Sequence, residues 1–225
     1  MAGAVILALA LPTAAAVQQG KAEVKSAKGS AEYSTGGAWA PLKSGMILGK
    51  GAAIKTGIGG EVRLSLGVNG EAVTITENTT VGIDKLEFDK TGADVVTETQ
   101  FDLRVGRILG NIKKSSPASR FEIKTPTGVA GIRGTKIDIS AGGVVKVIGG
   151  CVIVIYVTPS GEISTYEVCH GFKFVPGVGV VPMTNEEMQS GEWNKVTGKD
   201  SQTRQVQVEG VGTISTFVSP TLPPP

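Results

Sequence analysis

The residue types that most often perform catalysis are scarce in this chain. Of its 225 residues, one is histidine, His170, and two are cysteine, Cys151 and Cys169. Neighbouring residues on a strand point to opposite faces, so Cys169 and His170 are not expected to act together as nucleophile and base. No Gly-x-Ser-x-Gly turn is present to hold a serine nucleophile. We therefore predict a protein without catalytic residues, and an enzyme acting on a surface glycan is the weakest of three functional hypotheses.

The two cysteines stand on either side of a turn. Residues 151–157 read CVIVIYV and residues 162–169 read EISTYEVC, with Thr158-Pro-Ser-Gly161 between them. A hairpin centred near Ser160 places Cys151 directly opposite Cys169, at a Cα separation that a disulfide tolerates. The bond would close a loop of about 19 residues and stabilise the fold by roughly 3 kcal/mol. We predict this disulfide, and two buried free thiols are the alternative.

Other residue groups suggest a ligand without matching a known site. Gly128, Gly131 and Gly134 are spaced as in a phosphate loop, but the strand-like TKIDIS (135–140) follows where such a loop needs a helix. Four acidic residues could bind calcium, but their spacing matches no known calcium loop: Asp84, Glu87, Asp89 and Asp94. Trp39 and Trp193 are the candidates for stacking on a sugar. No metal and no cofactor is predicted.

Charge is distributed unevenly along the chain, although the formal net charge is only +2. Residues 61–103 carry 9 acidic and 3 basic side chains, whereas residues 104–136 carry 8 basic and 1 acidic. So small a net charge does not favour nucleic-acid binding, and none is predicted. The basic block either forms a positive face for a polyanion or a partner, or lies beside the acidic block within one sheet. The candidate contacts are Arg104, Arg107, Lys113, Lys114, Arg120 and Lys124.

The body of the chain shows the signature of short strands. Apolar and polar residues alternate with period two in residues 21–29, 61–67, 71–77, 121–126, 135–140 and 144–149. Aromatic residues make up only 5%, so the core should be aliphatic. Frequent turn signals, Asn69-Gly70 among them, predict an all-β fold of mainly antiparallel strands in an elongated sandwich or roll. A β-solenoid is the alternative. A capping box at Thr184–Glu187 predicts one short helix near 184–190.

The first sixteen residues form a separate segment. MAGAVILALALPTAAA is apolar, too short to span a bilayer, and places Ala14 and Ala16 before Val17 as in a cleavage site. We predict a signal peptide over 1–16 and an extracytoplasmic protein: periplasmic, on the cell surface or secreted. A buried apolar element is the alternative. No transmembrane segment is expected after cleavage, and residues 219–225 form a Pro-rich tail.

Two stretches carry a family resemblance. The first contains Trp39-Ala-Pro-Leu42, Gly45-Met-Ile-Leu48 and Gly51-Ala-Ala-Ile54, and then Thr56-Gly57 and the strand from Glu61. The second joins Leu103-Arg-Val-Gly-Arg107 to Phe121-Glu-Ile-Lys-Thr-Pro-Thr-Gly-Val-Ala-Gly-Ile-Arg-Gly-Thr135. Together they resemble the FecR-like domain, the periplasmic module of ferric-citrate-type regulators, over about residues 21–140. The run Thr-Pro-x-Gly-Val-x-Gly-Ile-Arg-Gly-Thr is the hallmark of that family.

The hallmark residues are expected to be structural. They are Thr125, Pro126, Gly128, Gly131, Arg133, Gly134 and Thr135. Thr125-Pro126 should hold an extended entry, and the three glycines should allow backbone angles or close approaches that other residues cannot adopt. Arg133 is expected among backbone carbonyls or against an acid such as Asp138.

The resemblance implies an exported, non-enzymatic β module that binds a protein partner or an envelope polymer. The alternative is a structural subunit that assembles with itself into a fibre or a surface layer. We divide the chain into the signal peptide, a FecR-like domain over 17–140, a β extension or second small subdomain over 141–218, and the tail. Family members that signal across a membrane carry a cytoplasmic helical segment, which this chain lacks, so direct transmembrane signalling is not expected.

Overall fold

The computed structural model describes residues 17–70, 72–113 and 116–190 with their side chains, and residues 203–208 and 212–217 as backbone. The predicted signal peptide (1–16), Lys114, Trp193 and the tail (219–225) lie outside the described residues. Among the helices of the described part, none has the length and hydropathy needed to span a bilayer.

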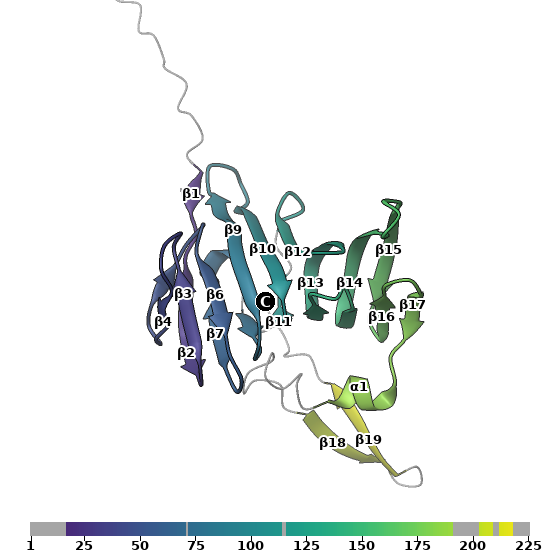
Figure 1. The fold of residues 1–225 in the computed structure, drawn as a ribbon. Helices are drawn as coiled ribbons and strands as arrows, with labels where there is room; N and C mark the ends of the chain where they lie inside the picture. Colours follow the sequence, from purple (N-terminus) through teal and green to yellow (C-terminus); the bar gives the residue numbers. More distant parts are fainter. Residues whose placement is uncertain (1–16, 71, 114–115, 191–202, 209–211, 218–225) are drawn as a thin grey trace, which may run out of the picture.

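The fold is nearly all β, as predicted. Seventeen strands form one sheet that curls into a half-barrel (Figure 1), and two further strands pair separately. The sheet has two arms, which share the long strands β13 (Gly128–Ser140) and β14 (Val145–Val157). We call them the first arm and the second arm.

The first arm is antiparallel throughout. In spatial order it contains β5 (Ile47–Leu48), β2 (Ala22–Lys28), β7 (Glu61–Ser65), β8 (Ala72–Ile75), β11 (Arg107–Asn111), the C-terminal half of β13, the N-terminal half of β14, β16 (Phe172–Val175) and β17 (Gly179–Pro182). A 3-10 turn, η1 (Gly67–Asn69), connects β7 to β8 at the predicted Asn69-Gly70 hairpin.

The second arm contains one parallel pair. In spatial order it contains β4 (Ala40–Pro41), β3 (Ala31–Ser34), β6 (Ala53–Thr56), β9 (Thr80–Asp89), β10 (Val96–Val105), β12 (Arg120–Thr125), the N-terminal half of β13, the C-terminal half of β14 and β15 (Ile163–Cys169). β10 and β12 are parallel, and β1 (Gln18–Gln19) pairs with β9.

β13 and β14 pass from one arm to the other because both strands bend near the middle. Before the bend Ile132 of β13 is buried, and after it Ile137 is buried, so the inward-facing side chains change from even to odd positions. Register shifts lie on both sides of Lys136. Gly134 (φ 64°) and Gly150 (φ 77°) adopt left-handed backbone angles that favour glycine. We call this bend, made by Gly134, Thr135, Gly149 and Gly150, the corner.

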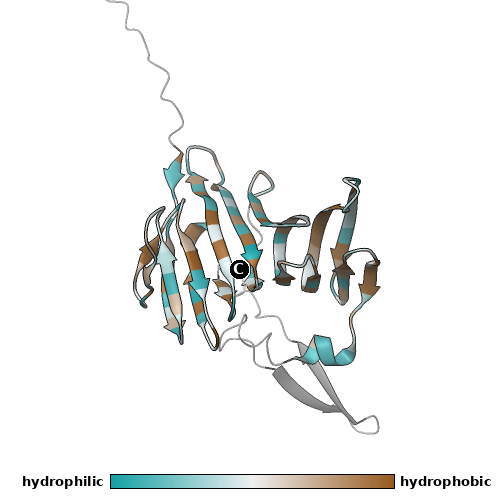
Figure 2. Cartoon of the chain, viewed as in Figure 1, coloured by the Kyte–Doolittle hydropathy of each residue, from teal (hydrophilic) through white to brown (hydrophobic). Residues whose placement is uncertain are grey.

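The core lies between the two arms and is mainly aliphatic. Figure 2 shows the alternation of hydrophobic and hydrophilic residues along the strands that face it. The largest side chains that are essentially inaccessible to solvent include Ile54, Leu64, Ile75, Ile83, Leu86, Leu103, Ile108 and Ile123. Phe101 and Phe121 add one aromatic contact, with ring centroids 6.0 Å apart. This composition agrees with the low aromatic content.

The one helix among the described residues is short, as predicted. α1 (Asn185–Gln189) begins at Thr184, whose hydroxyl accepts a hydrogen bond from the Glu187 backbone N–H at 3.2 Å. The Glu187 carboxylate accepts one in return from the Thr184 N–H at 3.0 Å. β18 (Thr203–Val208) and β19 (Gly212–Phe217) form a separate antiparallel pair.

Candidate functional site

The hallmark run begins with a tight turn between β12 and β13. Thr125 pairs with Gly128 across the hairpin, and the Thr125 hydroxyl donates to the Gly128 carbonyl oxygen at 3.3 Å. Gly128 has a φ of 154°, and a Cβ atom there would collide with the backbone carbonyl of Ile155. Pro126 stands in the two-residue loop, where its fixed φ suits a turn and its missing N–H breaks no ladder bond.

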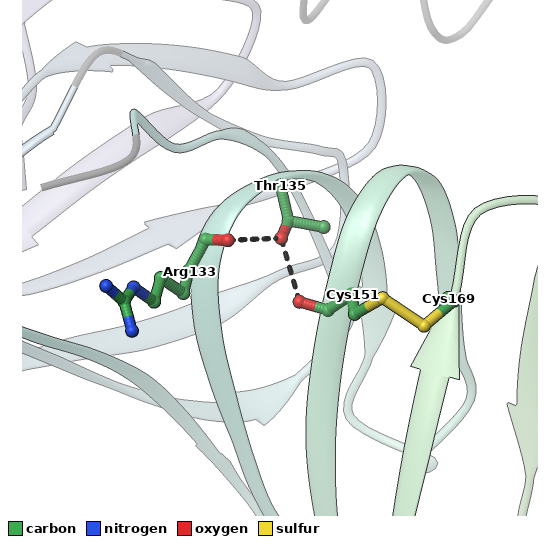
Figure 3. The surroundings of a disulfide bond; sticks show 4 residues. All are labelled: Arg133, Thr135, Cys151 and Cys169. Carbon is green, nitrogen blue, oxygen red and sulfur yellow. Dashed lines mark hydrogen bonds between the residues drawn. A yellow bond between two sulfur atoms is a disulfide. The ribbon is translucent and has the colours of Figure 1, made fainter. Parts of the chain in front are cut away.

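The run ends at the corner, where Thr135 is buried with 2% of its surface exposed. Its hydroxyl lies 3.1 Å from the Arg133 carbonyl oxygen and 3.0 Å from the Cys151 carbonyl oxygen (Figure 3). Gly150 packs so closely that a Cβ atom would lie 2.7 Å from the Gly134 carbonyl oxygen and 2.9 Å from Oγ1 of Thr135. Two of the hallmark residues, Gly134 and Thr135, therefore form one side of the bend that joins the two arms.

Two expectations for the hallmark run are wrong. Gly131 has neither a left-handed φ nor a close neighbour, because a Cβ atom there would lie 3.8 Å from the Ile153 carbonyl oxygen, an ordinary contact. Arg133 is exposed, and its side chain points away from the corner (Figure 3). It does not pair with Asp138, whose carboxylate binds another arginine.

Asp138 instead binds Arg107 of β11. The Arg107 guanidinium donates two hydrogen bonds to the carboxylate, from Nε at 2.6 Å and from Nη2 at 2.7 Å. The Asp138 side chain is 5% exposed and that of Arg107 33%. A bidentate pair of this kind compensates a carboxylate that would otherwise be buried alone. It fixes β13 to β11 in the first arm.

The predicted disulfide is confirmed. Cys151 of β14 and Cys169 of β15 lie directly opposite each other and are bonded, with Cα atoms 4.0 Å apart. The bond follows immediately after the corner, because Gly149 and Gly150 precede Cys151. It therefore holds the edge strand β15 to β14 at the point where β14 enters the second arm.

A groove of about 410 Å³ opens beside the corner. Its walls come from β11, β13, β14, the turn after β15 and α1, and they are Asn111, Ile112, Gly134, Thr135, Lys136, Ile148, Gly149, Gly150, His170 and Met188. We call it the corner groove. His170 is exposed, and its Nδ1 lies 2.8 Å from the Ile148 carbonyl oxygen. A carbonyl only accepts hydrogen bonds, so Nδ1 carries the proton.

The helix side of the corner groove is held by one carboxylate. Glu187 of α1 receives two hydrogen bonds from Lys173 Nζ, at 2.7 and 2.8 Å, and lies 3.1 Å from Lys146 Nζ. The Lys173 hydrogen bonds, with the Thr184 N–H and Lys146, lower the pKa of Glu187 from 4.5 to about 2. The next residue, Met188, lines the groove.

A sequence comparison matches residues 52–152 to the FecR protein family. This segment is a FecR domain. The match contains the complete hallmark run and ends one residue after Cys151, whereas the stretch from Trp39 to Leu48 precedes it. No curated protein matches the chain.

Within the FecR domain, the basic block lies beside acids. Arg104 Nε is 2.8 Å from Asp102, and Lys124 Nζ is 2.8 Å from Asp84. The hydrogen bond to Asp84 raises the pKa of Lys124. Arg107 binds Asp138, as described above. Arg120 and Lys113 are exposed on the surface, while Lys114 lies outside the described residues. Contact of these residues with a polyanion or a partner stays a prediction.

The acids considered as calcium ligands have separate roles in the FecR domain. Lys50 Nζ binds Glu87 at 2.8 Å, and this hydrogen bond, with one from Gln19, lowers the pKa of Glu87. Thr91 donates from both its hydroxyl and its N–H to Asp89, which lowers the pKa of Asp89. In the described ranges, the one cluster with metal-ligand spacing is Cys151, Glu167 and Cys169, whose sulfurs form the disulfide.

The remaining candidates do not converge on a site. Trp39 is 42% exposed next to the short strand β4, and Trp193 lies outside the described residues. The corner groove was missed by sequence reasoning, because its walls come from five segments that only the folded sheet brings together. The nearest signal was the pair Gly149-Gly150 opposite Lys136, which marks a place where the sheet lacks side chains.

Proposed function

We propose that this chain is an exported, non-enzymatic binding module, and that a protein partner docks on the outward surface of β14 and β15. One observation carries the proposal. Four large aliphatic side chains are exposed together there: Ile153 (43%), Ile155 (41%), Val157 (40%) and Ile163 (68%). We call this group the outer apolar face.

The outer apolar face follows from strand alternation. In the second half of β14 the even-numbered residues, such as Val152 and Val154, are buried, and the odd-numbered ones face solvent. Val157 lies opposite Ile163, and Gly131 lies opposite Ile153. A surface strand usually presents polar side chains on its solvent side, and clustered exposed aliphatics mark interaction sites. We therefore expect a binding partner to cover this face.

The edge of β15 suggests the form of the partner. Among the described strands β15 forms a ladder with β14 alone, so its outer edge offers backbone N–H and C=O groups. An extended segment of another protein can add to such an edge, and its alternating apolar side chains can then cover the outer apolar face. This supports a partner that presents a β strand of alternating apolar and polar residues.

Charge and chemistry favour this occupant over a polymer or a substrate. Three of the predicted basic contacts, Arg104, Arg107 and Lys124, are already paired with carboxylates, which weakens the case for a polyanion. The one histidine uses Nδ1 on a backbone carbonyl, the Ile148 carbonyl oxygen. A structural disulfide is typical of oxidising compartments and supports export.

The test places a photo-crosslinking residue at position 155 or, as a matched control, at Ile58, which is 86% exposed on a distant turn. Both chains are incubated with the native envelope fraction. We expect one protein to crosslink at 155 and not at 58. Once purified, it should bind the wild-type chain and Ile58→Lys alike, and Ile155→Lys at least about tenfold more weakly.

Two outcomes would refute the proposal. Crosslinks only between copies of this chain, with dimers or polymers in sedimentation, would establish the self-assembling subunit instead. Equal crosslinking from both positions, or a partner whose affinity Ile155→Lys does not change, would remove the outer apolar face as the binding surface.

A further inference from the structure

We infer that the corner groove binds an amphiphilic carboxylate: a molecule or chain terminus with one carboxylate group and an aliphatic body. This site is separate from the outer apolar face, and neither proposal depends on the other. The volume of about 410 Å³ falls within the range of small-molecule sites in proteins.

Lys136 is the residue that would bind the carboxylate of the ligand. It is half-buried on β13, between Asn111 of β11 on one side and Gly149 of β14 on the other. Within the described part of the chain no carboxylate pairs with Lys136, and no acidic residue lines the groove. Two other lysines, Lys146 and Lys173, are both paired with Glu187 of α1. Lys136 is thus an ammonium group available to an anion in a partly desolvated place.

Apolar side chains that line the groove would contact the aliphatic body of the ligand. Ile112 is buried at 4% exposure, and Ile148 and Met188 also line the groove. Methionine is flexible and polarizable, which suits a wall that adapts to an aliphatic chain. The hydrogen bond from His170 Nδ1 to the Ile148 carbonyl oxygen holds the imidazole in place as a further wall.

The space itself exists because the corner lacks side chains. A Cβ atom at Gly149 would meet no heavy atom within 4 Å, and its φ is not left-handed. A side chain at this position therefore fits the fold and enters the open space. The same bend that joins the two arms therefore also leaves the cavity.

The experiment measures binding to the full chain by calorimetry, using octanoate and its neutral counterpart octanamide. A second pair of probes is the peptide acetyl-Gly-Val-Leu with a free carboxylate and the same peptide as an amide. We expect at least one acid to bind, and to bind about tenfold or more tightly than its amide, because a charge-assisted hydrogen bond contributes to the acid alone. A tighter octanoate identifies a small molecule, and a tighter peptide acid identifies a chain terminus.

Two variants and a control locate the site. Lys136→Met should remove the preference for the acid over the amide, and Gly149→Leu should abolish binding of both. Lys55→Met, on an exposed lysine of β6, should change neither. Thermal unfolding of each variant checks that the fold is kept. Absence of binding by both acids at millimolar concentration, equal binding of acid and amide, or unchanged binding by Lys136→Met would each overturn the inference.

Discussion

Replacing both Cys151 and Cys169 by serine tests how the second arm is secured. The disulfide spans 18 positions of sequence and closes the β14–β15 hairpin. Loop-closure entropy for a ring of this size corresponds to about 3 kcal/mol of stability at 25 °C. For a domain of this length, that loss should lower the melting temperature by about 6 to 12 °C.

In this experiment the loss of stability reports on the disulfide bond itself and not on changed side-chain packing. Cys151 is exposed and Cys169 half-buried, so serine at either position leaves no polar group without water. Denaturant unfolding followed by circular dichroism gives the free energy, and wild-type protein in reductant should match the double variant. A loss below about 1 kcal/mol would refute the entropic reasoning, because the unfolded chain would then keep the hairpin closed without the bond.

Four further predictions concern the corner and its supports. Arg107→Met should destabilise the fold by about 3 to 5 kcal/mol in urea, since Asp138 stays buried without its partner, and adding Asp138→Asn should recover part of the loss. Thr135→Val should cost about 1 to 3 kcal/mol and Thr135→Ser clearly less, because only the valine removes the buried donor; equal losses would mean that the hydroxyl contributes nothing. Gly128→Ala should cost about 1 to 3 kcal/mol through backbone strain, whereas Gly131→Ala, as its control, should leave the melting temperature nearly unchanged. Glu187 has a lowered pKa of about 2, so its stabilisation is complete above pH 4.5 and lost as pH falls through about 2; Glu187→Gln should be less stable than wild type by about 1 to 2 kcal/mol at pH 7, and this difference should shrink steadily as pH falls from 4.5 to 2.

The strands and the disulfide were predictable because their information is local. Period-two alternation shows which face of each strand is buried, and the turn at Thr158–Gly161 fixes the register that pairs Cys151 with Cys169. The capping box of α1 is likewise contained in four consecutive residues.

The corner and its groove were not predictable from the same information. The change of parity in β13 arises where Gly134 and Gly150 face each other across two strands, and a single strand pattern does not show it. Asp138 meets Arg107, 31 positions away, only through the pairing of β11 with β13. Arg133 was misplaced for this reason, since a basic residue five positions away along the strand lies farther from Asp138 in space than Arg107 does.

The disulfide at the corner has a mechanical consequence. If a tethered molecule pulls on the free edge of β15, the tension enters β14 through a covalent link as well as through the ladder. β14 continues beyond the corner into the first arm, where it pairs with β13 and β16. Tension would therefore be carried into the opposite half of the molecule instead of peeling off one strand, and reduction of the bond would remove that resistance.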